Sequence, residues 1–180
     1  MLIPKEATLI EYPHVKQMHD WDCGPAVLSS VLKYQGKDIP YYDLIKALGC
    51  NQIVGTTIRS MLIVACQYGI QTVHGEHFTI DILKSSINNG HPVIISVQAW
   101  AERNRNYSHC WSEGHFVTCI GYSRDEIYFS DPYSNSITYL SVQDLLKRWR
   151  DMDGKKRYVQ WGMICLGECK WDQKQVILMG

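Results

Sequence analysis

The sequence has no net charge, no long apolar run and no N-terminal segment of the kind that directs secretion. Its 180 residues include 18 basic and 18 acidic side chains, so the formal net charge is zero. A neutral chain gives no electrostatic reason to expect nucleic acid or an anionic membrane as a partner. The longest apolar runs, such as residues 61–66 and 93–97, are far too short to cross a bilayer. We therefore expect neither a nucleic-acid partner nor insertion into a membrane.

A disulfide framework is also missing from the sequence. The chain has seven cysteines, an odd number, at irregular spacings, which suits a reducing compartment. Pro4 and Glu6 interrupt the N-terminus, which is unlike a cleavable secretory signal. We therefore expect a cytoplasmic protein, although export without a signal stays open, and the oligomeric state is not indicated. Four cysteines in apolar surroundings are predicted to be buried: Cys50, Cys66, Cys119 and Cys165.

No repeat, low-complexity tract or linker divides the chain, so we expect one domain over residues 1–180. The first half has helical periodicity: Val27, Leu28 and Val31 share one face of a helix that ends before Gly36. Short β-branched runs in the second half predict strands, and this order indicates an α+β fold. We expect helices at residues 25–34, 40–48, 56–69, 79–88 and 141–150, and strands at residues 92–98, 115–122, 126–131, 137–140 and 158–166.

Cys23 stands directly before the first predicted helix, in the segment Gln17-Met-His-Asp-Trp-Asp-Cys23-Gly24-Pro25. The N-terminus of a helix is the positive end of its dipole and carries unpaired N–H groups. Both favour the thiolate, which is the reactive form of cysteine. Asp22 and Gly24 make this an unsuitable core position. Cys23 is therefore predicted to be a nucleophile, with an inert thiol as the alternative.

Gln17 lies six residues before Cys23, on the approach to the same helix. Acyl transfer needs hydrogen-bond donors aimed at the developing oxyanion, commonly one backbone N–H and one side-chain amide. The backbone N–H of Cys23 and the amide of Gln17 are predicted to be these two donors. A surface role for Gln17 is the alternative if Cys23 is inert.

A thiol nucleophile needs a general base, and His115 is the best of seven histidines. It opens the predicted strand at residues 115–122, where side chains alternate, so it shares a face with Val117 and Cys119. Asp131 ends the next predicted strand. A three-residue hairpin loop at residues 122–124 would place Asp131 directly opposite His115, near enough to orient the imidazole. A simple strand-ending turn at Asp131-Pro132 is the alternative.

Taken together, these motifs resemble the bacteriocin-processing, double-glycine leader peptidases, cysteine peptidase family 39 of the papain-like superfamily. The likeness covers roughly residues 15–150 and includes Gln17, the segment Cys23-Gly24-Pro25-Ala26, Gly114-His115-Phe116-Val117, Gly121-Tyr122 and Asp131-Pro132. The order of these motifs in the chain is also that of the family.

The resemblance implies a papain-like fold, with a helical half that carries Cys23 and an antiparallel sheet that carries His115 and Asp131. It implies a peptidase that uses no cofactor and no metal: Cys23 attacks a peptide carbonyl, and His115 protonates the leaving amine. Members of the family are often fused to a membrane transporter and an ATPase. This sequence contains neither, so we expect a stand-alone peptidase acting on a protein or peptide, with a Gly-Gly leader as the first substrate to consider.

Residues next to the predicted nucleophile and base are expected to contact the substrate: Trp21, Asp22 and Gly114. The polar and aromatic stretch at residues 100–113 precedes His115 and is interpreted either as a groove-lining loop or as ordinary surface. Two groups of potential metal ligands lack a recognised zinc spacing, so no metal site is expected. They are His109, Cys110, Glu113 and His115, and also His14, His19, Asp22 and Cys23.

Other functions remain compatible with the same residues. An acyl-thioester at Cys23 can pass to an amine instead of water, which would make the protein an acyltransferase or deamidase. A non-catalytic peptide-binding module is the alternative from another class, because folds of this kind also serve as docking modules.

Overall fold

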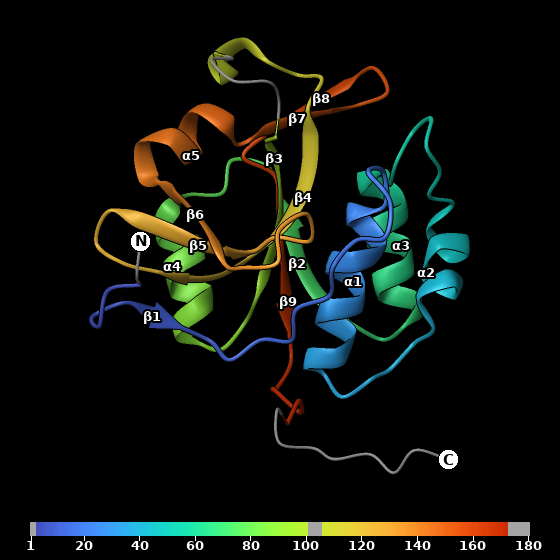
Figure 1. The fold of residues 1–180 in the computed structure, drawn as a ribbon, viewed down its shortest axis with the longest axis horizontal. Coiled ribbons are helices and arrows are strands. Elements are labelled where there is room, and N and C mark those ends of the chain that lie inside the picture. Colours follow the sequence, from blue (N-terminus) through green and yellow to red (C-terminus); the bar gives the residue numbers. More distant parts are fainter. Residues whose placement is uncertain (1–2, 101–105, 173–180) are drawn as a thin grey trace.

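An antiparallel sheet with helices on both faces forms the protein in the computed structural model, which describes residues 3–100 and 106–172 (Figure 1). The helices are α1 (Cys23–Tyr34), α2 (Tyr41–Leu48), α3 (Ile58–Gln67), α4 (Ile80–Asn88), α5 (Val142–Arg148) and the 3₁₀ turn η1 (Tyr107–His109). The strands are β1 (Thr8–Leu9), β2 (Gln71–Gly75), β3 (Val93–Gln98), β4 (Gly114–Tyr122), β5 (Glu126–Ser130), β6 (Thr138–Ser141), β7 (Arg150–Asp153), β8 (Lys156–Val159) and β9 (Gly162–Leu166).

The helix ends follow local capping chemistry. The Thr57 side chain accepts from the Ser60 N–H at the start of α3, and Thr79 does the same for Ile82 at the start of α4. Gly49 ends α2 in the left-handed conformation, with φ 62°, which a residue with a Cβ rarely adopts. None of the described helices is long and apolar enough to cross a membrane.

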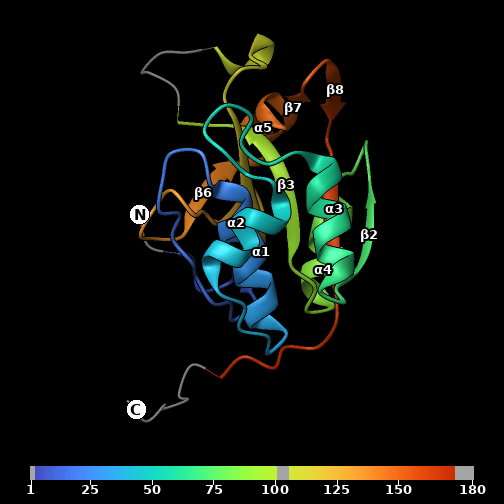
Figure 2. The same ribbon diagram turned by 90° about the vertical axis from the view of Figure 1, so that its right-hand side faces the viewer.

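The main sheet has seven strands in the order β2-β9-β3-β4-β5-β6, with β1 added beside β4. Helices cover both of its faces, as Figures 1 and 2 show, and a core of buried side chains lies on each face. Ile94 belongs to the core under α1, α2 and α3, whereas its neighbours Val93 and Ile95 belong to the core under α4 and α5. This alternation is expected for a strand that is buried on both faces.

The α+β class predicted from the sequence is confirmed, and the first four helices lie within about two residues of the predicted bounds. The single strand predicted at residues 158–166 is wrong, because the chain turns at Gln160, with φ 50°. Its first part is β8, which pairs only with β7, and its second part is β9 in the main sheet. The helix predicted at residues 141–150 ends at Arg148, and the next residue but one begins β7, which was not predicted.

Candidate active site

Cys23 is the first residue of α1 and its side chain is partly exposed. The helix packs on β4, which brings its first residue near the beginning of that strand. Gly24 permits a close approach of this helix end to the loop before α3, since a Cβ at Gly24 would overlap the Thr56 side chain. The Cys23 thiol raises the pKa of His115 through hydrogen bonding and charge, so the predicted nucleophile and base interact.

His115 lies between the Cys23 thiol and the Asp131 carboxylate. Its Nε2 donates to Asp131 Oδ1 at 2.8 Å, which leaves Nδ1 as the ring nitrogen for the thiol. Burial by itself lowers the pKa of His115, but the bonds to Asp131 and Cys23 outweigh it and raise the pKa to about 9. Burial likewise opposes ionisation of Asp131, but the hydrogen bond and charge of His115, together with the Tyr133 and Trp100 donors, outweigh it and lower the pKa of Asp131. The ring is therefore an imidazolium at neutral pH.

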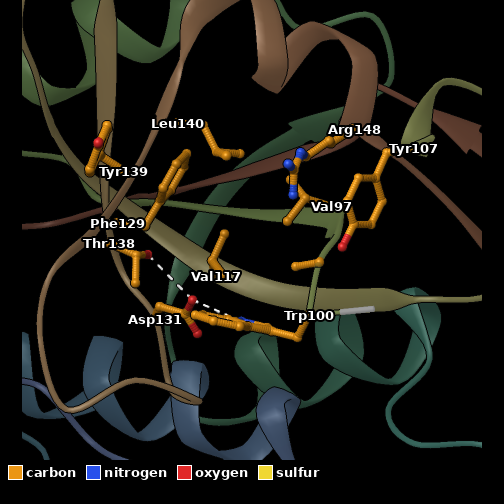
Figure 3. A pocket seen from close by; sticks show the side chains of 11 residues that line it. Val97, Trp100, Tyr107, Val117, Phe129, Asp131, Thr138, Tyr139, Leu140 and Arg148 are labelled. Carbon is orange, nitrogen blue, oxygen red and sulfur yellow. Dashed lines mark hydrogen bonds between the residues drawn. The ribbon is translucent and has the colours of Figure 1, made fainter. Parts of the chain in front are cut away.

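Asp131 is held by donors on both carboxylate oxygens, and Figure 3 shows the two that bond Oδ2. Oδ1 accepts from the Tyr133 backbone N–H at 3.0 Å in addition to His115. Oδ2 accepts from the Trp100 indole N–H at 3.1 Å and from the Thr138 hydroxyl at 3.3 Å. The side chain is only 4% exposed. A carboxylate fixed by four donors can hold the imidazole in one orientation.

The strand register that places His115 near Asp131 differs from the prediction. Thr118 lies opposite Ser130, so continuing the ladder by one residue puts Asp131 opposite Val117. Its predicted partner, His115, is two residues further along β4. Next to the hairpin loop, Tyr122 pairs with Ile127. If this register continued along both strands, the His115 and Asp131 side chains would lie on opposite faces of the sheet. A bulge between Cys119 and Gly121 shifts the register by one residue and returns them to the same face.

Gln17 is buried beside this group, with 9% exposure. Its backbone N–H donates to the Pro132 carbonyl at 2.9 Å, which ties the loop before α1 to the end of β5. One side-chain N–H donates to the His19 carbonyl at 2.7 Å, and the second is left for another acceptor. Its Oε1 has no hydrogen-bond partner among the described residues.

A groove of about 240 Å³ contains Cys23 and His115, together with two of the three expected substrate contacts, Trp21 and Gly114. Trp21 is stacked on His19 with ring centroids 4.7 Å apart. The third expected contact, Asp22, is instead fully buried. Its carboxylate accepts from the backbone N–H and the ring of His19, both at 2.9 Å. Asp22 therefore shapes the loop before the helix and cannot reach a substrate in the groove.

The stretch at residues 100–113 reaches the site at both of its ends, whereas residues 101–105 lie outside the described part of the chain. Trp100 bonds Asp131, and Trp111 and Ser112 line the groove. The interpretation as a groove-lining loop therefore holds for its described end. Within the described residues, no group of three or more potential ligands is arranged to bind a metal. The prediction of a buried Cys66 is wrong, because this side chain is exposed on α3.

Asp151 is a groove residue that the sequence did not single out. It lies on β7 and accepts from the Ser96 hydroxyl and from the Met152 backbone N–H, the latter at 2.7 Å. A Cβ at Gly114 would overlap its carboxylate, so glycine is needed there. Burial raises the pKa of Asp151 to about 6. No motif pointed to it, because Arg150-Asp-Met-Asp-Gly154 reads as a polar turn.

Trp100 is the second residue that sequence reasoning missed. Its backbone has φ 58°, which is uncommon for a residue with a Cβ and is found where the surroundings hold a side chain in place. Its ring packs on Tyr133, with centroids 4.9 Å apart. A second cavity, of about 220 Å³, borders Asp131 and Trp100 and has apolar walls that include Val97 and Phe129 (Figure 3). Trp100 thus lies between this cavity and the candidate site and donates to Asp131.

Replacing Trp100 by phenylalanine keeps the ring and removes the N–H that bonds Asp131. We expect kcat to fall about threefold to tenfold, because a hydrogen bond to a charged group contributes about 1 kcal/mol or more. The lost donor also raises the pKa of Asp131, so the acid limb of the kcat–pH profile should move to higher pH. A remote W171F variant is the control, and an unchanged acid limb in W100F would exclude a positioning role.

Comparisons with known proteins agree on one protein family. The model of the peptidase C39-like family matches residues 9–157. A curated relative, the sublancin-168-processing and transport ATP-binding protein SunT of Bacillus subtilis strain 168, is 26% identical over 137 residues. The match covers 74% of this chain but only 17% of the length of SunT.

Solved structures share the fold at low sequence identity. A putative C39-like peptidase from Bacillus anthracis has a TM-score of 0.69 and 18% identity, covering 92% of this chain and 100% of that one. The peptidase domain of Streptococcus ComA has a TM-score of 0.65 and 22% identity, covering 86% of this chain and 98% of that one. A double-glycine motif protease from a transporter, solved with its leader peptide, has a TM-score of 0.61 and 18% identity, covering 87% and 91%. The papain-like fold and the family model together show that this chain belongs to the peptidase C39-like family.

Proposed function

We propose that the protein is a cysteine peptidase that hydrolyses a peptide bond through a thioester at Cys23. The observation that carries the proposal is the placement of Cys23 and His115 in one groove, where the thiol raises the pKa of His115 and the His115 ring bonds Asp131 at 2.8 Å. A nucleophile, a base and an orienting carboxylate in series are the elements of covalent acyl transfer.

In the proposed reaction the Cys23 sulfur bonds to the substrate carbonyl carbon, and the carbonyl oxygen becomes an oxyanion. The backbone N–H of Cys23 and the free side-chain N–H of Gln17 would stabilise that charge. Collapse of the intermediate breaks the C–N bond, and the His115 imidazolium donates its proton to the leaving amine. Water then attacks the thioester while His115 accepts a proton from it, which releases the acid and restores the pair.

The substrate class proposed is a peptide. One structural neighbour is described in complex with a leader peptide, and a curated relative is described as a processing protein. By analogy, a peptide containing a Gly-Gly sequence is the first substrate to test on this chain. The match covers only 17% of the length of the curated relative, so the proposal concerns peptide hydrolysis alone.

Labelling with a thiol-directed peptidyl electrophile, followed by mapping of the modified residue, tests the proposal. Exposure alone would favour Cys66 and Cys169, which are both exposed, whereas a peptide seated in the groove delivers the electrophile to Cys23. We expect modification at Cys23, competed by excess peptide. Iodoacetamide, which carries no peptide, is the control and should also modify Cys66 and Cys169. Labelling by the peptidyl reagent only at those two positions would overturn the proposal.

A further inference from the structure

The carboxylate of Asp151 lies in the candidate active-site groove but has no part in the proposed reaction. It is on the second residue of β7 and lines the groove together with Cys23 and His115. It lies directly over Gly114, the residue that precedes His115. The Ser96 hydroxyl and the Met152 backbone N–H hold it in place. Asp151 is therefore a fixed acidic group immediately beside the proposed reaction centre.

The groove as a whole is acidic. Asp20 and Asp153 also line it, and its described lining residues include no lysine or arginine. Two nearby arginines are engaged with Trp111: the guanidinium of Arg150 lies 5.4 Å from the ring centroid and that of Arg157 lies 4.8 Å from it. Among the described lining residues, His115 is the one basic side chain, and its positive charge is already paired with Asp131.

Apolar side chains line the approach to Asp151. Trp21, Val54, Trp111 and Met152 contribute to the wall of the same groove. A side chain with an aliphatic stem and a positively charged head would pack its methylene groups on such a wall and place its charge at the carboxylate. Lysine and arginine are the natural side chains with this construction.

We propose that Asp151 is a specificity-determining residue that binds the ammonium or guanidinium group of a lysine or arginine next to the scissile bond. This inference rests on the proposed function, because it takes the groove to be the binding site for a peptide. A bound peptide displaces water from the groove, and a carboxylate that loses water without gaining a cation is disfavoured. Because Asp151 adjoins Gly114, the basic residue belongs within two residues of the bond that is cleaved.

The test compares peptides that are identical except for lysine, acetyl-lysine or norleucine at one position. The variable position is moved over two residues on either side of the bond. At one position we expect the wild type to show a kcat/KM for lysine about tenfold or more above that for norleucine or acetyl-lysine. In D151N this ratio should fall to about one. D38N removes the same charge from an exposed site away from the groove and should keep the wild-type ratio.

Acidification provides a second measurement of the same group. Since burial raises the pKa of Asp151 to about 6, lowering the pH through about 6 protonates the carboxylate. The preference for lysine should decline over that range in the wild type and stay flat in D151N. The groups facing Asp151 are those that its neighbours on β7, β4, β3 and β8 contribute: Asp153, His115, Ser96, Gln98 and Tyr158.

Binding of the same peptides to the C23A protein, followed by fluorescence anisotropy, separates specificity from catalysis. Hydrolysis by the wild type with a lysine-to-norleucine ratio near one at every position would overturn the inference and leave the proposed function standing. A lysine preference in binding that disappears in D151N, without any hydrolysis by the wild type, would support the binding role and overturn the peptidase proposal. A preference that D151N leaves unchanged would overturn the assignment to Asp151. The acetyl-lysine comparison needs no variant and stands even if D151N does not fold.

Discussion

Replacing Cys23 by alanine is expected to abolish peptide hydrolysis, lowering kcat by a factor of about 10⁴ or more, as loss of the nucleophile does in other acyl-transfer enzymes. The reason is that Cys23 is the one cysteine among the described residues that line the groove with His115. Peptide binding should persist, because the groove walls remain intact. Steady-state hydrolysis of a fluorogenic peptide measures the first effect, and anisotropy measures the second.

The same variant has a consequence for His115 that can be observed without substrate. The hydrogen bond and the charge of Cys23 both raise the pKa of His115. Removing the thiol should lower that pKa, which an NMR titration of the imidazole C–H signals detects. C66A is the matched control, since Cys66 is exposed on α3. Equal hydrolysis by C23A and C66A would contradict the nucleophile assignment, and persistent binding alone would favour a docking module.

The helical half was predictable because local capping interactions set the helix boundaries. Thr57 and Thr79 accept hydrogen bonds from the first turns of α3 and α4, and Gly49 ends α2 with a positive φ. These signals depend on residues three or four positions away, so the sequence alone contains them. Cys23 could be placed at a helix start for the same reason.

Features that depend on distant strands were harder to predict. The bulge between Cys119 and Gly121 sets the register of β4 against β5, but the close approach of β1 also requires glycine at position 121, so this glycine did not by itself specify a bulge. The run from Tyr158 to Leu166 alternates like one strand, but pairing with β7 at one end and with β3 and β2 at the other divides it. Pairing partners lie far away in the chain, so periodicity could not reveal the division.

The candidate site follows the same distinction. Four residues that stand in recognisable motifs were predicted as a set. The structure places Cys23 and His115 in one groove, bonds His115 to Asp131, and ties Gln17 to Pro132. Trp100 and Asp151 reach the site only through tertiary contacts, from a strand end and from an unpredicted hairpin. Asp22 was expected to contact the substrate, but its carboxylate is buried and bonds the His19 ring.

Replacing Asp131 by alanine should lower kcat by about 10²–10³-fold, within the range that general acid–base groups contribute. Asp131 accepts the Nε2 proton of His115 and so keeps Nδ1 towards the thiol. Asparagine retains an acceptor oxygen but no charge, so D131N should lose less activity and chiefly change the pH dependence. T138V removes one donor, at 3.3 Å, to the carboxylate and serves as the matched mild variant.

The sign of the pH dependence follows from the raised pKa of His115. Activity that needs the imidazolium as proton donor declines as pH rises through about 9 in the wild type. In D131N the carboxylate charge is lost, so the alkaline limb should move down toward the ordinary histidine value of about 6.5. Stability follows the same sign: the imidazolium–carboxylate pair stabilises the folded protein fully below about 6.5 and no longer does so above about 9. Profiles of kcat and of thermal unfolding from pH 5 to about 10.5 would show both effects. If the alkaline limb of the kcat profile stays in place in D131N, a group other than the His115–Asp131 pair controls that limb.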